Sequence, residues 1–340
     1  MTPAGELLAA EIRRGGPVPF HRFMEVALYD AEHGYYRSAR DPFGKAGDFF
    51  TAEQIQPVFG ILMAACIREL FREMGEPAGF TVVELGAGRR EMTESFSQWN
   101  YVPVDIDGGE VPDGLTGVIF SNEFFDALPV DAVIYEDGVF REQRVGLTGE
   151  VFHWQTAGVV DAEAEEYLRR YYPAPEEGRW YEVNLAALAW MERIAAKLTK
   201  GSVLTIDYGF TRAESVRFPG GTLMGYRRHT AREDVLTEPG MRDITAHVNF
   251  TALEEKGAAC GLARQRFETL AQTLLTVGER DQFAAALGEG DGEGDGDGEG
   301  EGNDSLRRRM QLKTLLFGMG ETFRVLLQRK GWGREAERRV

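Results

Sequence analysis

The feature that most constrains this chain is an alternation of strand-like and helix-like segments between residues 80 and 209. Short strand-like runs at 80–86, 101–107, 117–123 and 202–209 alternate with helical stretches, such as 92–99 and 186–201. Strands that alternate with helices predict a mostly parallel sheet covered by helices on both faces. We therefore expect an α/β fold, in which FFDALPV after the strand at 117–123 forms a further helix.

Four of the predicted strands end in polar residues or glycine. Their ends read ELGAG at 84–88, DID at 105–107, SNE at 121–123 and IDYG at 206–209. In parallel α/β sheets, ligands bind beyond the carboxyl ends of the strands. We therefore expect the active site at this edge of the sheet.

The flanking segments have other patterns. Apolar residues at helical spacing predict helices within 1–78, separated by the glycine- and aromatic-rich loop 34–52, which either packs on the core or contacts a ligand. Residues 141–155 look like a hairpin, and 161–172 look like a helix. The apolar run in 321–331 predicts a terminal edge strand.

The chain is strongly acidic, with a net charge of −17 from 38 basic and 55 acidic residues. Residues 288–304 hold eight of these acids in a Gly-acid repeat, which cannot bury apolar surface and is predicted to be disordered. Without the repeat the charge is about −9, that of a mildly acidic body. An acidic chain is repelled by nucleic acid and by anionic membranes, and we expect neither as a partner.

Cysteine content and apolar runs bear on the compartment. The two cysteines, Cys66 and Cys260, are too few for a disulfide framework and fit a reducing environment. The best apolar run, residues 55–67, is interrupted by Pro57 and stops at Arg68, so membrane insertion is not expected. The N-terminal residues lack the basic-then-apolar layout of a signal peptide. We expect a soluble, cytoplasmic protein.

The first strand end indicates a nucleoside cofactor. A Gly-x-Gly turn at Gly86 and Gly88 lets the backbone approach a ligand closely, but Glu91 stands where a dinucleotide fingerprint has its third glycine. The acid before the turn, Glu84, favours S-adenosylmethionine (SAM), whose amino-acid end carries an ammonium. Asp105 lies 21 residues further on, where a carboxylate can accept both ribose hydroxyls, and Asp107 is the competing choice.

The third strand end carries Asn122, Glu123 and Asp126. One interpretation is structural: Asn122 caps a helix, and Asp126 lies favourably in its first turn. The other is functional, because neighbouring carboxylates at a strand end suit a guanidinium, a planar cation with five donors.

These blocks together carry a family resemblance. NEFFDALPV, KAGDFFTAEQIQPVFG, VVELGAG, LTIDYG, GTLMGYRRH and DITAHVNFTAL span residues 34–275 in the family's order, and MGETFRVL matches its C-terminal end. The chain in these respects resembles the MidA-like family of SAM-dependent methyltransferases. That family includes a mitochondrial protein-arginine methyltransferase that assists assembly of respiratory complex I.

The resemblance implies a Rossmann-like methyltransferase sheet with an N-terminal helical segment and an inserted lid. It implies SAM as the cofactor, and as the partner a protein that presents an arginine, which a respiratory-complex subunit could supply. It places these residues at or near the cofactor or the acceptor: Glu84, Gly86, Gly88, Lys45, Gly47, Asp48, Phe49, Thr51, Asn122, Glu123 and Asp126.

The sequence departs from the family pattern in three places. Arg89 and Arg90 follow Gly88 where the family usually has another glycine, so either could crowd SAM or pair with its carboxylate. The stretch between Gly88 and Val118 is short, which bears on the assignment of Asp105. Asn249 stands where the family usually has Asp.

Methyl transfer from a sulfonium is an in-line displacement that depends mainly on alignment. We assign Glu123 and Asp126 to orienting the acceptor nitrogen and stabilising developing charge, with Asp207 and Tyr208 as secondary candidates. His229 is a candidate proton acceptor, although a histidine in a lid is more often a structural hydrogen-bonding group, and the same applies more strongly to His247. No metal-ligand pattern such as H-E-x-x-H occurs, so metal catalysis is not expected.

Other functions stay open at this point: an assembly factor that binds SAM or a partner without turnover, a small-molecule methyltransferase, and a nicotinamide oxidoreductase, which Glu91 disfavours. We divide the chain into a helical segment at 1–78, a SAM-binding Rossmann-like core at 79–210, a lid or substrate subdomain at 211–262, and a C-terminal stretch at 263–340 that completes the core and contains the acidic loop 288–304.

Overall fold

The computed structural model describes residues 1–37, 56–227, 230–288 and 299–331. The chain forms two compact units, each assembled from three separate stretches. Unit 1 comprises Met1–Phe50, Phe125–Trp190 and Gly209–Leu253, and unit 2 comprises Thr51–Phe124, Met191–Tyr208 and Glu254–Val340. The division expected from the sequence used continuous stretches, whereas each unit gathers stretches from across the chain.

The sheet of unit 2 has the strand order β14–β15–β9–β4–β2–β3. The four strands predicted from the alternating pattern, β9, β4, β2 and β3, are mutually parallel, and β15 and β14 add to them in antiparallel fashion. The bounds are β2 (Thr81–Leu85), β3 (Asn100–Val104), β4 (Leu115–Asn122), β9 (Leu198–Phe210), β14 (Ala263–Thr269) and β15 (Phe323–Lys330). The α/β fold with a Rossmann-like sheet is thereby confirmed.

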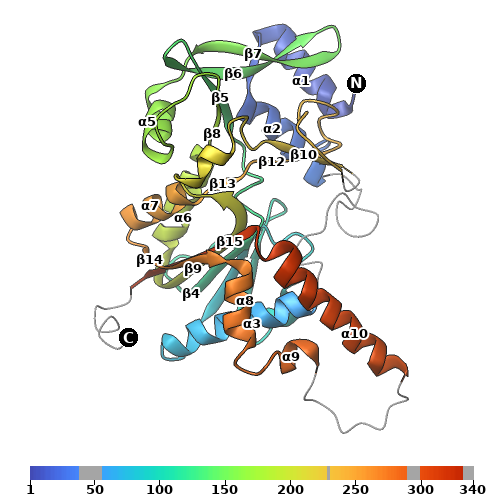
Figure 1. Cartoon of the computed structure of the whole chain (residues 1–340), viewed down its shortest axis with the longest axis vertical. Coiled ribbons are helices and arrows are strands. Elements are labelled where there is room, and N and C mark those ends of the chain that lie inside the picture. Colours follow the sequence, from blue (N-terminus) through green and yellow to red (C-terminus); the bar gives the residue numbers. More distant parts are fainter. Residues whose placement is uncertain (38–55, 228–229, 289–298, 332–340) are drawn as a thin grey trace. The chain divides into compact units, whose positions relative to one another are not determined.

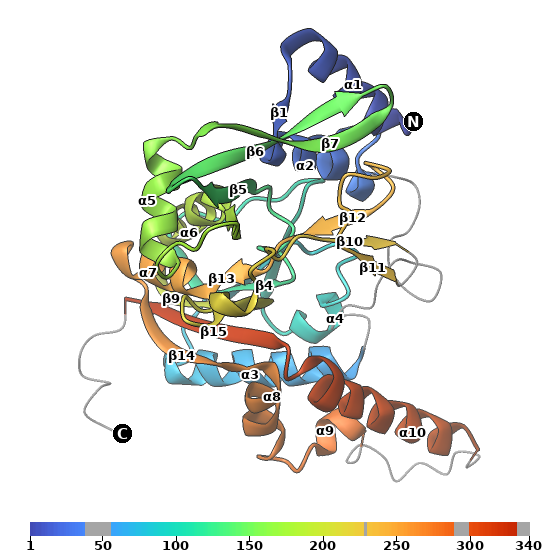
Figure 2. The ribbon, with the colours of Figure 1, turned by 45° about the horizontal axis from the view of Figure 1, so that its top comes forward.

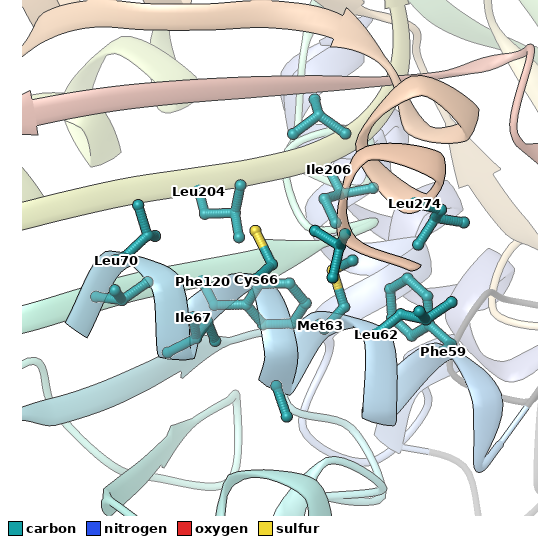
Figure 3. Close-up of a cluster of buried hydrophobic side chains, with 14 of the residues drawn as sticks. Phe59, Leu62, Met63, Cys66, Ile67, Leu70, Phe120, Leu204, Ile206 and Leu274 are labelled. Carbon is teal, nitrogen blue, oxygen red and sulfur yellow. The ribbon is translucent and has the colours of Figure 1, made fainter. Parts of the chain in front are cut away.

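Helices cover this sheet and build its core. The helices of unit 2 are α3 (Val58–Glu73), α4 (Thr93–Phe96), α8 (Leu270–Gly278), α9 (Ala284–Leu287), α10 (Glu299–Thr314) and the π-helix η4 (Leu315–Met319), and α6 (Leu185–Lys197) and α7 (Phe250–Ala259) end in it. Figure 3 shows Phe59, Met63 and Cys66 of α3 among side chains of β4, β9 and α8. The apolar run that resembles a membrane span is thus the helix that packs on the sheet (Figure 2).

Unit 1 contains an antiparallel sheet in the order β1–β6–β5–β8, with β7 paired to β6. A smaller sheet has the order β11–β10–β12, and β13 pairs in parallel with Gly209 and Phe210. The bounds are β1 (Val18–Pro19), β5 (Asp131–Glu136), β6 (Val139–Thr148), β7 (Val151–Val159), β8 (Trp180–Val183), β10 (Met224–Arg227), β11 (Thr230–Arg232), β12 (Asp243–Thr245) and β13 (Val248–Asn249). The predicted hairpin at 141–155 is β6 and β7 (Figure 1).

The helices of unit 1 are those expected near the N-terminus and after the hairpin. They are α1 (Pro3–Gly15), α2 (Phe20–Tyr29), α5 (Ala162–Tyr171) and the short 3-10 turns η1 (Tyr35–Arg37) and η3 (Glu214–Arg217). Thr2 caps α1 by accepting a hydrogen bond from the Gly5 amide at 3.0 Å. Phe20 and Phe23 of α2 pack into one core cluster, and Tyr167 and Tyr171 of α5 pack into a second.

Three predictions about local structure are wrong. FFDALPV is not a helix but a turn, in which the Leu128 amide donates to the Phe125 carbonyl, so Asn122 caps no helix. The strand at 321–331 is not at an edge, because β15 lies between β9 and β14. The acidic stretch is not irregular throughout 288–304, since α10 begins at Glu299, where acids favour a helix N-terminus. Residues 289–298 lie outside the described residues.

Candidate functional site

The strand register brings the predicted strand ends together at one edge of unit 2. Leu85 of β2 lies opposite Val104 of β3 on one side and Ser121 of β4 on the other. Asn122 of β4 lies opposite Ile206 of β9. The residues that follow these strands therefore share the carboxyl edge of the sheet, as expected for a ligand site in this type of fold.

The turn after β2 exposes backbone because of its two glycines. Gly86 has φ +70° and Gly88 has φ +46°, both in the left-handed region that favours glycine. The Gly86 amide donates to the Val104 carbonyl at 2.9 Å, which ties the turn to β3. A Cβ added at Gly86 would lie 3.1 Å from the ring of Phe124. The turn therefore presents bare backbone, and a side chain at Gly86 would crowd the Phe124 ring.

Asp105 fixes the same turn. One carboxylate oxygen of Asp105 accepts the Gly88 amide at 2.5 Å, and the other accepts the Ile106 amide at 2.6 Å. Each oxygen keeps a second lone pair, so the carboxylate can accept further hydrogen bonds from a ligand. Asp107, the competing choice, is exposed in the following turn. Asp105 is thus the acid that holds the glycine turn, and its role toward a cofactor stays a prediction.

Glu84 is the buried acid of this edge. Its carboxylate is 1% exposed and accepts a hydrogen bond from the Tyr101 hydroxyl of β3. A buried carboxylate is costly unless it is hydrogen-bonded or paired with a cation. Tyr101 was not singled out from the sequence, since a tyrosine within a strand usually indicates only packing.

Asn122 and Glu123 form a small polar group at the end of β4. The Asn122 side-chain amide donates to the Glu123 carboxylate at 3.2 Å, and the Glu123 backbone amide donates to the Ile206 carbonyl at 3.0 Å. Glu123 has φ 51°, which is strained for a residue with a side chain. The side-chain oxygen of Asn122 is buried and has no hydrogen-bond partner among the described residues. Such an acceptor fits a ligand that brings a donor.

Asp207 and Tyr208, the secondary candidates, lie at the end of β9. Asp207 is fully buried, and its carboxylate accepts the Tyr208 backbone amide at 2.9 Å. The Tyr208 ring packs edge-on against Phe323 of β15, with 4.9 Å between centroids. These contacts give Tyr208 a packing role in the sheet.

Unit 1 contains a separate cluster around Asp126. Asp126 is buried, and its backbone carbonyl accepts the Ala246 amide at 2.9 Å. The Tyr36 hydroxyl donates to Asp243 at 2.7 Å, and its ring lies 5.5 Å from that of Tyr29. Burial chiefly, then the nearby charges of Asp243 and Asp126, raise the pKa of Tyr36 well above its ordinary value. The cluster therefore combines two buried carboxylates with two tyrosines.

The remaining predicted residues have structural roles or lie elsewhere. Burial lowers the pKa of His247 to about 4, and its ring packs edge-on against Phe218, which favours the structural interpretation. Asn249 accepts the Ala252 amide at the start of α7 and donates to the Tyr171 carbonyl at 3.1 Å. The following predicted residues lie outside the described residues: Lys45, Gly47, Asp48, Phe49, Thr51 and His229.

The contacts of the two arginines after Gly88 give no sign that either side chain blocks the glycine turn. Arg89 and Arg90 are both exposed, and Arg89 pairs with Glu91 at 3.7 Å. Burial raises the pKa of Glu91, while Arg89 opposes that rise. Glu91 thus stands where a dinucleotide fingerprint has its third glycine, and its side chain forms an ion pair with Arg89.

No three or more His, Cys, Asp or Glu side chains among the described residues are arranged to hold a metal ion. Within the same part of the chain, every helix is too short or too polar to cross a bilayer.

The family follows from a sequence comparison. Residues 93–268, just over half of the chain, match the model of a family described as "Putative S-adenosyl-L-methionine-dependent methyltransferase". The chain belongs to this family. It is a SAM-dependent methyltransferase, and SAM is its cofactor.

Relatives of this family member support the assignment. It is 26% identical over 306 residues to the protein arginine methyltransferase NDUFAF7 homolog, mitochondrial, of Drosophila melanogaster, covering 72% of this chain and 67% of that one. It is 25% identical over 311 residues to human NDUFAF7, covering 74% and 68%. A crystal structure from Burkholderia thailandensis with bound S-adenosyl-homocysteine superposes with a TM-score of 0.84 at 27% identity, covering 96% and 92%.

The expectation of a cytoplasmic location is wrong. The curated relatives from Drosophila, Xenopus and human are mitochondrial proteins.

The residues present fit the family's cofactor. The turn at Gly86 presents backbone without a side chain, and Asn122 offers a buried acceptor without a partner among the described residues. Asp105 stands at the end of β3 with lone pairs to spare. A nucleoside with ribose hydroxyls and an ammonium supplies donors for each of these acceptors.

Proposed function

We propose that this methyltransferase modifies an arginine side chain of a protein. The observation that carries the proposal is the polar edge of unit 2, where the glycine turn, Asp105 and the strained Glu123 follow neighbouring parallel strands. The named relatives in flies, frogs and humans, each called a protein arginine methyltransferase, support arginine as the acceptor.

Glu84, Gly86, Gly88, Asp105 and Asn122 would hold SAM. Bound SAM supplies a methyl group on a sulfonium, which is activated for nucleophilic attack. The glycine turn would give backbone contact, and Asp105, which accepts the Gly88 amide, would also accept the ribose hydroxyls. Asn122 presents its buried side-chain oxygen to the ligand. Gly47, Asp48 and Thr51 complete this predicted set.

Glu123 and Asp126 would orient the acceptor. A guanidinium keeps its charge in proteins and presents planar donors, so carboxylates can hold one nitrogen in the attacking direction. The Asn122 side-chain amide donates to the Glu123 carboxylate and so orients it. The left-handed backbone of Glu123 fixes the direction in which its side chain leaves the main chain. Asp126 lies in unit 1 and Glu123 in unit 2, and the role of Asp126 stays a prediction from the sequence. His229 remains the proposed proton acceptor.

The acceptor protein follows from the family resemblance. A subunit of a respiratory complex is the partner we propose, since the resembled family includes a factor that assists such assembly. The net charge of −17 suits an acceptor segment rich in basic residues.

The test is methyl transfer from SAM labelled in its methyl group. The purified chain is incubated with arginine-rich peptides and with an extract of mitochondrial proteins, and the product is hydrolysed to identify the modified residue. We expect labelled methylarginine in protein. Label that appears only in small molecules would favour the small-molecule alternative. SAM binding without any transfer would favour a non-catalytic binding protein.

A further inference from the structure

β7 stands apart from the other sheet edges in its lack of protection. Among the described residues its one strand neighbour is β6, and Figure 1 shows it as the outermost strand beside that partner. It runs for nine residues, VFHWQTAGV, without a proline or a charged side chain. An exposed strand of this length presents unpaired amides and carbonyls to any extended chain.

The other edges are blunted in familiar ways. β14 carries Arg264, Arg266 and Glu268 on the edge of the unit 2 sheet, and β3 carries Pro103 at the opposite edge. β8 has four residues, and its Trp180 amide donates to the Pro219 carbonyl outside the sheet. Charge, proline or an outside contact thus protects β14, β3 and β8, whereas among the described residues β7 has no such protection.

The hairpin geometry fixes which β7 groups face outward. Thr148 and Val151 close the hairpin across the two-residue turn at Gly149 and Glu150. In such a hairpin the closing pair exchanges both backbone hydrogen bonds, and the pairs then alternate along the ladder. The backbone groups of Phe152, Trp154 and Thr156 therefore point away from β6.

The side chains of β7 would let another strand pair with this edge without moving the core of unit 1. Phe152 and Trp154 face inward and pack against the unit 1 core, where Trp154 lies 4.8 Å from Phe20 by ring centroids. The opposite face ends in Val151 and Val159, which are 69% and 58% exposed. The register irregularity of β7 falls after Thr156, so residues 151–156 form a regular strand.

We propose that β7 is a dimer interface, in which the β7 strands of two copies pair in antiparallel fashion about Trp154. This register places Phe152 of each copy opposite Thr156 of the other, and Trp154 opposite itself, so all three outward-facing residues find partners. The contact is isologous, because the same residues serve both copies. A second copy fits this edge since an uncharged strand meets its own copy without like charges opposite one another.

The pairing does not depend on the proposed acceptor or on catalysis. Each copy carries a net charge of −17, so the association should strengthen as salt screens the repulsion between the two bodies. A basic peptide as occupant of the same edge would show the reverse dependence on salt.

The first experiment is sedimentation velocity on the full chain over a range of concentrations. We expect a species of twice 37.9 kDa. Thr156→Pro removes the outward amide and should weaken association about tenfold or more, since two interchain hydrogen bonds are lost per dimer. Thr156→Val is the matched control, because it also loses the hydroxyl that accepts from Gln143 yet keeps the amide.

A second experiment locates the contact. In a Cys260→Ser background, one chain carries His153→Cys and a second, differently tagged chain carries Gln155→Cys. The proposed register makes these positions a directly opposite, non-hydrogen-bonded pair, whose Cβ atoms approach to about 4.5 Å, within reach of a disulfide. Burial raises the pKa of Cys66 to about 11, which keeps that thiol unreactive.

We expect an efficient mixed disulfide only when the two chains are combined. SAM binding and thermal unfolding of each variant check that it is folded. A chain that is monomeric at all concentrations would overturn the proposal. A dimer that Thr156→Pro leaves intact, or one that gives no mixed disulfide, would overturn it as well.

Discussion

Two residues of the candidate site share a left-handed backbone for different reasons. Gly86 adopts φ +70°, and an added Cβ would lie 3.1 Å from the Phe124 ring, so both the backbone and the close approach of Phe124 favour glycine there. Glu123 adopts φ 51° although it carries a long side chain, and the β4–β9 pairing holds it there through the Ile206 carbonyl. Strain retained at such a position motivates the proposal that Glu123 serves function.

Gly86→Ala tests the role of the glycine turn. Alanine at φ +70° costs about 1 kcal/mol in stability. Gly79→Ala is the matched control, since Gly79 has φ +76° with open space around its Cβ position. We expect similar stability losses for both, but SAM affinity, measured by isothermal titration, should fall at least about tenfold for Gly86→Ala alone. Equal affinities in the two variants would contradict a role of the turn in SAM binding.

Glu123→Gln tests the role of the carboxylate. The amide keeps the shape of the side chain but loses the negative charge that would orient a guanidinium. We expect kcat to fall about 100-fold while the Kd for SAM changes less than about threefold. Glu94→Gln, at an exposed acid of α4, is the control. A parallel loss in kcat and SAM affinity would assign Glu123 to the cofactor instead.

Asn249→Asp tests why this chain departs from its family. The Asn249 amide donates to the Tyr171 carbonyl, and an aspartate would place a buried negative charge against that oxygen. The cap on the Ala252 amide would survive. We expect the free energy of unfolding to fall by about 1–3 kcal/mol in urea denaturation at neutral pH. SAM affinity should stay unchanged; a selective gain in activity would instead give the position a functional role.

The sequence was informative where chemistry follows strand ends. Glu84, Gly86, Gly88 and Asp105 could be chosen because a Gly-x-Gly turn and a spaced acid leave a recognisable pattern. Tyr36 and Asp243 could not, because their hydrogen bond joins residues 207 apart in the chain. No local pattern reports such a contact.

At the scale of elements, burial decided most assignments. β2 is buried at every residue, as expected for an interior parallel strand. FFDALPV has a helical apolar pattern, but Asn184 donates to the Phe125 carbonyl and Ala246 donates to that of Asp126, which holds this stretch in a turn. β15 was predicted to be an edge strand, because the order of strands along the chain does not show which strands become neighbours in the sheet.

Gly117→Ala tests how closely the central strands approach. A Cβ at Gly117 would lie 1.9 Å from the Thr81 carbonyl oxygen of the neighbouring strand, and φ is +153°. The sheet would have to open locally, so we expect a loss of about 3 kcal/mol or more in unfolding free energy. Gly114→Ala, at φ +70° with open space, should cost only about 1 kcal/mol. Equal losses of unfolding free energy in the two variants would mean that the positive φ, and not the approach to Thr81, sets the cost.

At the scale of the whole molecule, two histidines give opposite pH dependences. The hydrogen bond to Asp131 raises the pKa of His21, so its contribution to stability is present below pH 6.5 and is lost as pH rises through the raised value. Burial lowers the pKa of His247 to about 4. The unfolded chain then binds more protons at this site, and stability is lost as pH falls from 6.5 towards 4.

His247→Gln tests which histidine dominates. His21 is half-exposed and screened by solvent, whereas His247 is buried, so we expect His247 to prevail. Because of His247, the free energy of unfolding of the unsubstituted chain should be about 2 kcal/mol lower at pH 5 than at pH 7. Guanidinium titrations at both values should show that this difference shrinks in His247→Gln. An unchanged difference would contradict the assignment.

The interior place of β15 has a consequence for biosynthesis. The ribosome releases residues 323–330 long after β9, yet this strand bonds to β9 along residues 201–208 and to β14 on its other side. A nascent chain paused before β15 would expose two unsatisfied ladders at once. Ribosome-bound intermediates of this protein should therefore engage chaperones until β15 has emerged.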